Sequence, residues 1–339
     1  MDSPWQGKHV LVTGGLGFLG SHFVTELLAH GAYVSAATRR ADPRRCTWLP
    51  VSGNLRVLEF DPLDGVRLRA ALCRAVPRLD AVVHCAGMDG NAEFKRRHST
   101  EILNVNVSLA ANVLNGARDA GIATVVLASS AETDAGPAQV PFVPGRSLDG
   151  YARSKAGTEF LAELHRTQYG TRTFLPRFAN LYGPRDRFGD AARVIPAMLT
   201  RILSGDAVEV WGDGQQLRSF IHVTDAVRAT LQIAAQDREH LVTIGTAEAI
   251  SIVDLARLLF GLLDVPERIS TVGPAGPERI GTAGAGDRRP QGRALDVSVM
   301  NRLIDFTPRT LRDGLAGTIR WYRAERGGSQ PPPYAIRGT

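Results

Sequence analysis

The sequence predicts an α/β protein in which a Rossmann-type, doubly wound parallel sheet carries a smaller α/β substrate-binding lobe. Over residues 1–180, short apolar runs alternate with helical patterns, which is the repeat that a parallel sheet with right-handed crossovers requires. Several of these runs are continuous Val, Leu and Ala stretches, as expected for strands that helices cover on both faces. A glycine-rich segment follows the first run and opens the first helical pattern. Together these observations indicate a dinucleotide-binding fold.

The expected elements of the sheet follow one another along the chain. Strands are predicted at residues 9–13, 32–36, 55–60, 81–84, 124–128 and 173–177, and helices at 17–30, 66–76, 99–120 and 151–170. Residues 223–235 and 241–244 add one more helix and one more strand that return to the sheet. We therefore expect residues 1–180 and 219–247 to form an NAD(P)-binding domain.

The second half of the chain is less regular, because proline and glycine cluster between its apolar segments. Helices are predicted near 191–203, 252–263 and 297–304. We expect residues 181–218 and 248–326 to form the smaller lobe. Residues 327–339, which include a Gly-Gly-Ser-Gln-Pro-Pro-Pro run, are expected to form a flexible tail.

The composition excludes several other classes of protein. The 339 residues are 44% hydrophobic and 22% charged, close to an average soluble protein. The longest apolar run falls short of about 18 residues and the N-terminus lacks a secretory apolar region, so we expect no membrane partner. Three scattered cysteines predict neither a disulfide framework nor a zinc site, which leads us to expect no metal and a cytoplasmic location.

The charge balance favours a small anionic ligand. The net charge of +6 comes from 37 arginines and only 3 lysines against 34 acidic residues. Because the positive charges are spread along the chain without a long basic block, we expect no nucleic-acid partner.

The sharpest local signal is the segment Val10-Leu-Val-Thr-Gly14-Gly-Leu-Gly17-Phe-Leu-Gly20. Gly14 permits a tight turn, Gly17 lets backbone N–H groups approach a pyrophosphate, and Gly20 lets the helix pack against the strand. The helix N-terminus then stabilises the phosphate charge. The alternative is that these glycines serve plain turns.

The residues after the second strand favour NADP(H), with NAD(H) as the alternative. NAD enzymes usually carry Asp or Glu there to accept from the ribose, whereas this chain has Thr38-Arg39-Arg40. An arginine fork suits a 2′-phosphate, unless Arg39 and Arg40 are ordinary surface charges. Asp61 is expected to accept from the adenine amino group, and its neighbour Pro62 has no N–H to offer.

A tyrosine and a lysine form the predicted catalytic pair. Tyr151 and Lys155 lie four residues apart in a helical pattern, which places them on one face. A tyrosine titrates near ~10, and a neighbouring ammonium favours the phenolate, so the pair can exchange a hydroxyl proton while a hydride moves. A serine at the end of the strand before them, Ser130 or alternatively Ser129, can hydrogen-bond the reacting hydroxyl.

With these motifs in view, the chain resembles the extended short-chain dehydrogenase/reductase family, in its nucleotide-sugar epimerase/dehydratase branch. The resemblance covers roughly residues 8–325. It rests on the glycine motif, Asn106, Tyr151 and Lys155, the run Arg177-Phe-Ala-Asn180-Leu-Tyr-Gly-Pro184, and the run from Val210 to Asp225. GDP-fucose synthases and GDP-mannose 3,5-epimerases look most alike.

The resemblance implies a function for many positions. It implies a triad of Ser130, Tyr151 and Lys155, a homodimer paired through helices 99–120 and 151–170, and a nucleotide-diphosphate sugar as substrate, with Arg218 on the diphosphate. Further substrate contacts are expected from Met88, Asp89, Asn180, Arg193, Val194 and Arg293. Further cofactor contacts are expected from Leu16, Phe18, Leu19, Ala86, Gly87, Asn106 and Phe178.

Two departures from the family pattern affect the expected reaction. Glu132 stands where 3,5-epimerizing relatives carry a cysteine, and Arg193 stands where fucose synthases carry a histidine. A carboxylate facing the sugar can remove an acidified C–H next to a transient ketone. We therefore expect an NADP(H)-dependent epimerase that acts through a transient 4-keto sugar. The alternatives are a dehydratase with Glu132 as base, a 4-keto-sugar reductase, or a dinucleotide-sensing regulator without catalysis.

Overall fold

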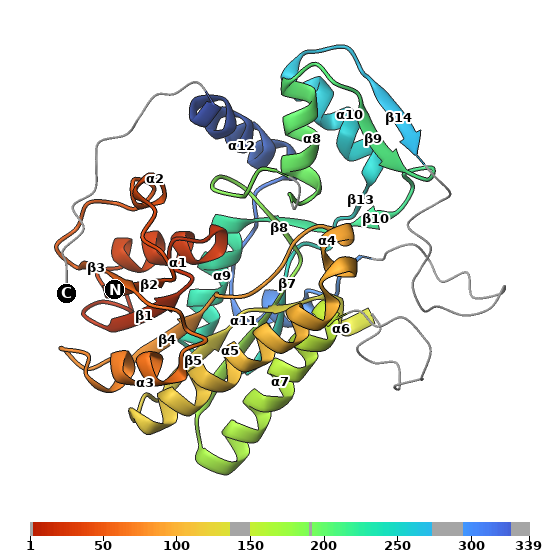
Figure 1. Ribbon diagram of the computed structural model, residues 1–339. Helices are drawn as coiled ribbons and strands as arrows, with labels where there is room; N and C mark the ends of the chain where they lie inside the picture. Colours follow the sequence, from red (N-terminus) through yellow and green to blue (C-terminus); the bar gives the residue numbers. More distant parts are fainter. Residues whose placement is uncertain (1–2, 136–149, 190–191, 273–293, 327–339) are drawn as a thin grey trace.

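The computed structural model describes residues 3–135, 150–189, 192–272 and 294–326. Its centre is a parallel sheet whose strands lie in the order β3-β2-β1-β4-β5-β7-β12, with β6 paired to β7 (Figure 1). The strands are β1 (His9–Thr13), β2 (Tyr33–Thr38), β3 (Leu55–Glu59), β4 (Ala81–His84), β5 (Thr124–Leu127), β6 (Ser129–Ser130), β7 (Arg172–Phe178) and β12 (Leu241–Ile244). The predicted doubly wound α/β fold is confirmed.

Helices cover both faces of this sheet, as the continuous apolar strands predicted. One face carries α3 (Gly65–Cys73), α5 (Ser99–Asp119) and α7 (Gly150–Tyr169), and the other carries α1 (Phe18–Ala29), α9 (Val223–Ala234) and α11 (Ser298–Leu303) (Figure 1). In β1, Val10 and Val12 belong to one hydrophobic core and Leu11 to the other. Alternate side chains of one buried strand therefore stabilise both layers.

A second group of elements forms the small lobe above one end of the sheet (Figure 1). Its helices are α8 (Val194–Leu203), α10 (Ile252–Leu263) and α12 (Leu311–Arg326), which share one hydrophobic core. Its strands pair in twos and are β8 (Asn180–Tyr182) with β11 (Phe220–His222), β9 (Val208–Trp211) with β14 (Ile269–Val272), and β10 (Leu217–Arg218) with β13 (Ile250–Ser251).

The sequence analysis missed several short elements. The strand pairs of the lobe and helix α12 were not predicted, nor were α2 (Pro43–Cys46), α4 (Ala92–Arg97) and α6 (Glu132–Ala135). Strands of two to four residues carry too few side chains to give a period. The predicted tail, 327–339, lies outside the described residues. Among the helices that the structure describes, none combines the length and apolar character needed to cross a bilayer.

Candidate active site

The glycine turn between β1 and α1 forms a cradle for a dinucleotide phosphate. Gly14 has a φ of +66°, and a Cβ at this residue would lie 2.9 Å from the backbone nitrogen of Ala86. A Cβ at Gly20 would collide with the carbonyl oxygen of Gly14, so only glycine lets α1 start this close to the turn. The N-cap of α1, Gly17, carries no side-chain cap, which suits an anion at the helix N-terminus. The turn therefore fits the pyrophosphate of a dinucleotide.

A single cleft of about 2070 Å³ extends from this turn across the carboxyl ends of the strands to the small lobe. Every site residue predicted from the sequence lines it, except Arg293, which lies outside the described residues. The structure thus brings together residues from the segments after β1 and β4 and from β2, β6, α4, α7 and α8, which are far apart in the sequence. A cleft of this kind at the carboxyl end of a parallel sheet is the usual place for a ligand.

The predicted catalytic pair lies at the first turn of α7. Tyr151 makes a side-chain hydrogen bond with Ser130, which lies at the end of β6. The Nζ atom of Lys155 donates to the carbonyl oxygen of Ala128 at 2.7 Å and lies 5.7 Å from the Tyr151 ring centroid. Burial raises the pKa of Tyr151 well above its usual value, while the hydrogen bond with Ser130 lowers it.

The structure separates the two candidate serines. Both serines are buried and line the cleft, but the Ser129 hydroxyl donates to Glu159 at 2.5 Å. Glu159 also forms a two-point ion pair with Arg177, whose N–H groups donate at 2.8 and 2.6 Å. Ser130 is therefore the serine that faces Tyr151, and Ser129 belongs to the network that fixes the strand end.

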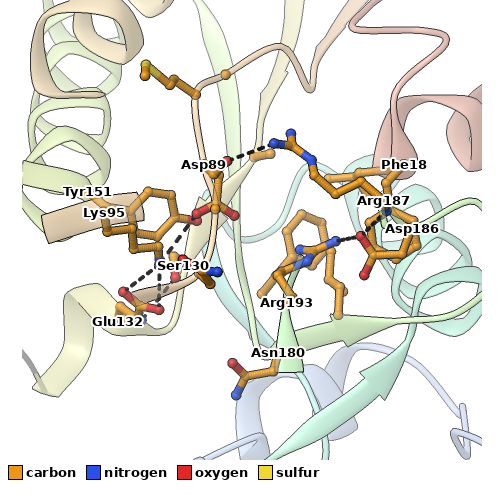
Figure 2. Close-up of a pocket in the computed structure, with 18 of the residues that line it drawn as sticks. Phe18, Asp89, Lys95, Ser130, Glu132, Tyr151, Asn180, Asp186, Arg187 and Arg193 are labelled. Carbon is orange, nitrogen blue, oxygen red and sulfur yellow. Dashed lines mark hydrogen bonds and ion pairs between the residues drawn. The ribbon is translucent and has the colours of Figure 1, made fainter. Parts of the chain in front are cut away.

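A second lysine, which the sequence analysis did not single out, lies against Tyr151. The Nζ atom of Lys95, on α4, is 3.6 Å from the Tyr151 ring centroid (Figure 2). It donates to both carboxylate oxygens of Glu132, at 3.1 and 3.3 Å, and lies 3.5 Å from Asp89 Oδ1. A signal was available, because Lys95 is one of only three lysines in a chain with 37 arginines.

The carboxylates of this group are held by cations. Burial acts to raise the pKa of Asp89, but Lys95 and Arg193 outweigh it and hold that pKa below its usual range. Glu132 lies at the rim, with 46% of its side chain exposed, and is paired with Lys95. The carboxylate that the sequence analysis proposed as a base at position 132 is thus part of an ion pair.

The opposite wall of the cleft is built around Arg193, at the start of α8. Its guanidinium donates to Asp186 at 2.9 Å and lies 4.6 Å from the centroid of the Phe18 ring (Figure 2). The side-chain amide of Asn180 donates a hydrogen bond to the carbonyl oxygen of Ser219. Arg218 is exposed and lines the cleft in the small lobe. Arg218 is therefore the more accessible of the two groups for a diphosphate.

At the end of the cleft next to β2, hydrogen bonds to the backbone fix the segment that carries Arg39 and Arg40. The Thr38 hydroxyl donates to the carbonyl of Arg40, and the Glu59 carboxylate accepts from the N–H of Ala41. Arg39 and Arg40 are exposed, line the cleft, and have no ion pair with the part of the chain that the structure describes. They are thus available to a phosphate.

Two predicted cofactor residues also have internal bonds. The Asn106 amide accepts from the N–H of Met88 at 2.7 Å and donates to its carbonyl at 3.1 Å, which fixes the loop after β4. Asp61 accepts from the N–H of Leu63 at 3.0 Å.

In the described ranges no cluster of His, Cys, Asp and Glu is suited to hold a metal ion.

Comparisons with known proteins agree with this geometry. Residues 10–245 match the model of the NAD dependent epimerase/dehydratase family. The chain is 42% identical to a dTDP-4-dehydro-6-deoxy-D-allose reductase of a Streptomyces species, over 95% of this chain and 98% of the reductase. It is 26% identical to a GDP-mannose 3,5-epimerase of Oryza sativa subsp. indica, over 95% of this chain and 83% of the epimerase.

A solved structure is also similar to this chain. A dTDP-glucose 4,6-dehydratase from Streptomyces venezuelae, solved with NAD bound, superposes with a TM-score of 0.77 at 28% identity, over 94% of this chain and 98% of that chain. The fold, the glycine turn and the Tyr151 site define an enzyme of the extended short-chain dehydrogenase/reductase class. The chain belongs to the NAD dependent epimerase/dehydratase family, and the expected resemblance is confirmed.

Proposed function

We propose that this enzyme reduces the 4-keto group of a nucleotide-linked 6-deoxyhexose with NADPH. The observation that carries the proposal is the ion pair between Lys95 and Glu132. Epimerization at a carbon next to the ketone and dehydration both need a base that takes a proton from a sugar carbon, and the sequence analysis assigned that step to Glu132. Reduction needs only a hydride and a proton for the oxygen. The 42% identity to reductases of keto sugars over nearly the whole chain supports the same choice.

The proposed mechanism uses the residues at the end of β6 and the start of α7. A nicotinamide cofactor, bound at the glycine turn, would supply the hydride. Tyr151 donates its proton to the oxygen of the ketone, and Ser130 holds that oxygen by a hydrogen bond. Lys155, anchored on the Ala128 carbonyl, lies behind Tyr151. The high pKa of Tyr151 keeps the phenol protonated at neutral pH, which suits a general acid.

The two parts of the fold divide the binding. We propose that residues 1–180 and 219–247 hold the dinucleotide and that residues 181–218 and 248–326 hold the nucleotide sugar. Arg218 would bind the diphosphate, and Asp89 and Arg193 would face the sugar from opposite walls of the cleft.

Product analysis tests the proposed reaction. We expect NADPH oxidation with a dTDP-4-keto-6-deoxyhexose, and weaker or no oxidation with the GDP, UDP and CDP analogues. Deuterium from 4-deuterated NADPH should appear at sugar C4, while D₂O should leave the sugar carbons unlabelled. Solvent deuterium at C3 or C5 without net NADPH consumption would instead establish an epimerase.

The cofactor preference has a direct test at Arg39 and Arg40. Their joint replacement by alanine should weaken NADPH binding by about 10- to 100-fold and change NADH binding little, because only NADPH carries the 2′-phosphate. Titration of cofactor fluorescence measures both affinities. Arg44→Ala is the matched control, since Arg44 lies on the neighbouring α2 and does not line the cleft. Equal losses for NADPH and NADH would exclude the assignment.

We also propose a homodimer formed through α5 and α7. Leu103 on α5 and Phe160 and Leu164 on α7 are exposed, with Phe160 at 66%. Apolar side chains at this spacing on a helix surface form a face that a second copy can bury. Phe160→Glu should shift the protein from dimer to monomer in analytical ultracentrifugation, whereas Val66→Glu, at an exposed position on α3, should leave the dimer intact.

A further inference from the structure

We propose that Lys95 is a positioning residue that acts through Tyr151: its ammonium stabilises the phenolate that forms when Tyr151 gives up its proton, and Glu132 and Asp89 limit that effect. The inference rests on the proposed reductase function. It assigns a role to α4, a helix that the triad of Ser130, Tyr151 and Lys155 does not include.

The distances place Lys95 nearer to the phenol than the lysine of the triad. The Nζ atom of Lys95 is 3.6 Å from the ring centroid, against 5.7 Å for Lys155. The Lys155 ammonium also donates a hydrogen bond to the carbonyl oxygen of Ala128. Lys95 is therefore the ammonium in closer contact with the Tyr151 ring, and its charge acts to lower the pKa of Tyr151.

The local structure holds Lys95 in this place. Glu93 pairs with Arg96 and Arg97 on the outer side of α4, at 2.7 and 2.6 Å. Lys95 points inward instead, with 18% of its side chain exposed, and bonds both oxygens of Glu132 (Figure 2). In α4, the two arginines thus lie on the outer face and pair with Glu93, whereas Lys95 lies against Tyr151.

The charges around Tyr151 act in opposite directions. Burial raises the pKa of Tyr151 most, Asp89 and Glu132 raise it further, and Lys95 lowers it. The charged groups that face the phenol are Asp89, Lys95, Glu132, Lys155 and Arg193. The ease of forming the phenolate therefore depends on one close ammonium and the two carboxylates that pair with it.

The reaction step gives this charge a use. The hydride adds to the carbonyl carbon, the C=O π pair moves to oxygen, and that oxygen takes the phenol proton. A bound NADPH would supply the hydride and leave as NADP⁺. The ketone becomes an alcohol, and Tyr151 becomes a phenolate that later regains a proton from water. Lys95 is in contact with the ring on which this negative charge develops.

The pH dependence of the reverse reaction tests the inference, because oxidation of the alcohol with NADP⁺ requires the phenolate. Because the phenol is mostly protonated from about pH 6 to about pH 10, we expect kcat to rise with pH over this range and to be about 10- to 100-fold lower at each pH in Lys95→Met, which is a displacement of the rising limb by about one to two pH units to higher pH. Lys95→Arg should restore most of the shift. Glu132→Gln should move the limb lower, and Lys8→Met, on the surface beside Asp80, should not move it. The inference would be overturned if both Lys95→Met and Glu132→Gln lowered the rate but did not move the rising limb of kcat in opposite directions along the pH axis.

A measurement without turnover separates this inference from the proposed function. With three lysines in the chain, ¹³C-labelled lysine gives three ε-methylene signals that Lys→Met variants assign. The Lys95 signal should be displaced upfield by the ring current of Tyr151, and Tyr151→Leu should abolish the displacement. An undisplaced signal refutes the inference at any activity. If the wild type reduces none of the keto sugars, the proposed function fails, but the inference about Lys95 can still be tested.

In that case a pH titration followed by the ¹³Cζ signal of Tyr151 reports the pKa of the phenol directly. We expect that pKa to rise in Lys95→Met and to fall in Glu132→Gln.

Discussion

Replacement of Tyr151 by phenylalanine is expected to lower kcat for reduction of the keto sugar by about 10²- to 10⁴-fold, the range that a lost general acid costs. The variant loses one oxygen atom and with it the phenol proton that lies beside Ser130. NADPH affinity should stay within about threefold of the wild type, because the glycine turn and Arg39 and Arg40 are untouched.

Tyr169→Phe is the matched control for this prediction. It makes the same chemical change on the same helix, at a tyrosine that is 51% exposed. Stopped-flow absorbance of NADPH under single turnover measures the chemical step, and cofactor fluorescence measures binding. A Tyr151→Phe enzyme that retained most of its rate would mean that another group delivers the proton.

The same pair of measurements bears on the regulator alternative. A dinucleotide sensor would bind NADPH, show no turnover as the wild type, and lose nothing on removal of the Tyr151 hydroxyl. The arrangement of Tyr151, Ser130 and Lys155 around the end of β6 supports an enzyme instead. Binding without turnover in the wild type, with every nucleotide tested, would favour the sensor.

The sheet and the cofactor turn could be predicted from sequence because their signals are local. Buried parallel strands require continuous apolar runs, and the run from Val10 to Val12 is completely buried. Gly20 is required by the carbonyl of Gly14, six residues earlier in the chain, and Gly14 adopts a positive φ in the turn itself. Such constraints leave a spacing that can be recognised without knowledge of the tertiary structure.

The charge network could not be predicted in the same way. Helix α4 has six residues and buries none of them, so it leaves no apolar period to detect. The contacts of Lys95 with Glu132 and Tyr151 join segments 37 and 56 residues apart, and only the folded chain brings them together. The ion pair between Lys95 and Glu132 was not anticipated for this reason. Helix α12, by contrast, carried a readable pattern in Leu315, Ile319 and Tyr322.

The buried ion pair behind the site gives the second large effect, on stability. Glu159 and Arg177 expose 12% and 18% of their side chains and join α7 to β7. Glu159→Ala leaves the Arg177 guanidinium without its carboxylate in a buried position, and removes the acceptor of the Ser129 hydroxyl. We expect the free energy of unfolding to fall by about 3–5 kcal/mol, measured by urea denaturation.

Helix α7 also provides the control that isolates burial. Glu163 and Arg166 form the same two-point pair, at 3.0 and 3.1 Å, but expose 42% and 44% of their side chains. Glu163→Ala should cost about 0–1 kcal/mol, because water replaces the lost partner. Since the charges and the two distances are alike, the difference between the two variants measures what burial and the hydrogen bond from Ser129 add. Equal losses would show that the Glu159–Arg177 pair is screened by water, and the rigid support that it gives to the Ser129–Ser130 strand end would then need another source.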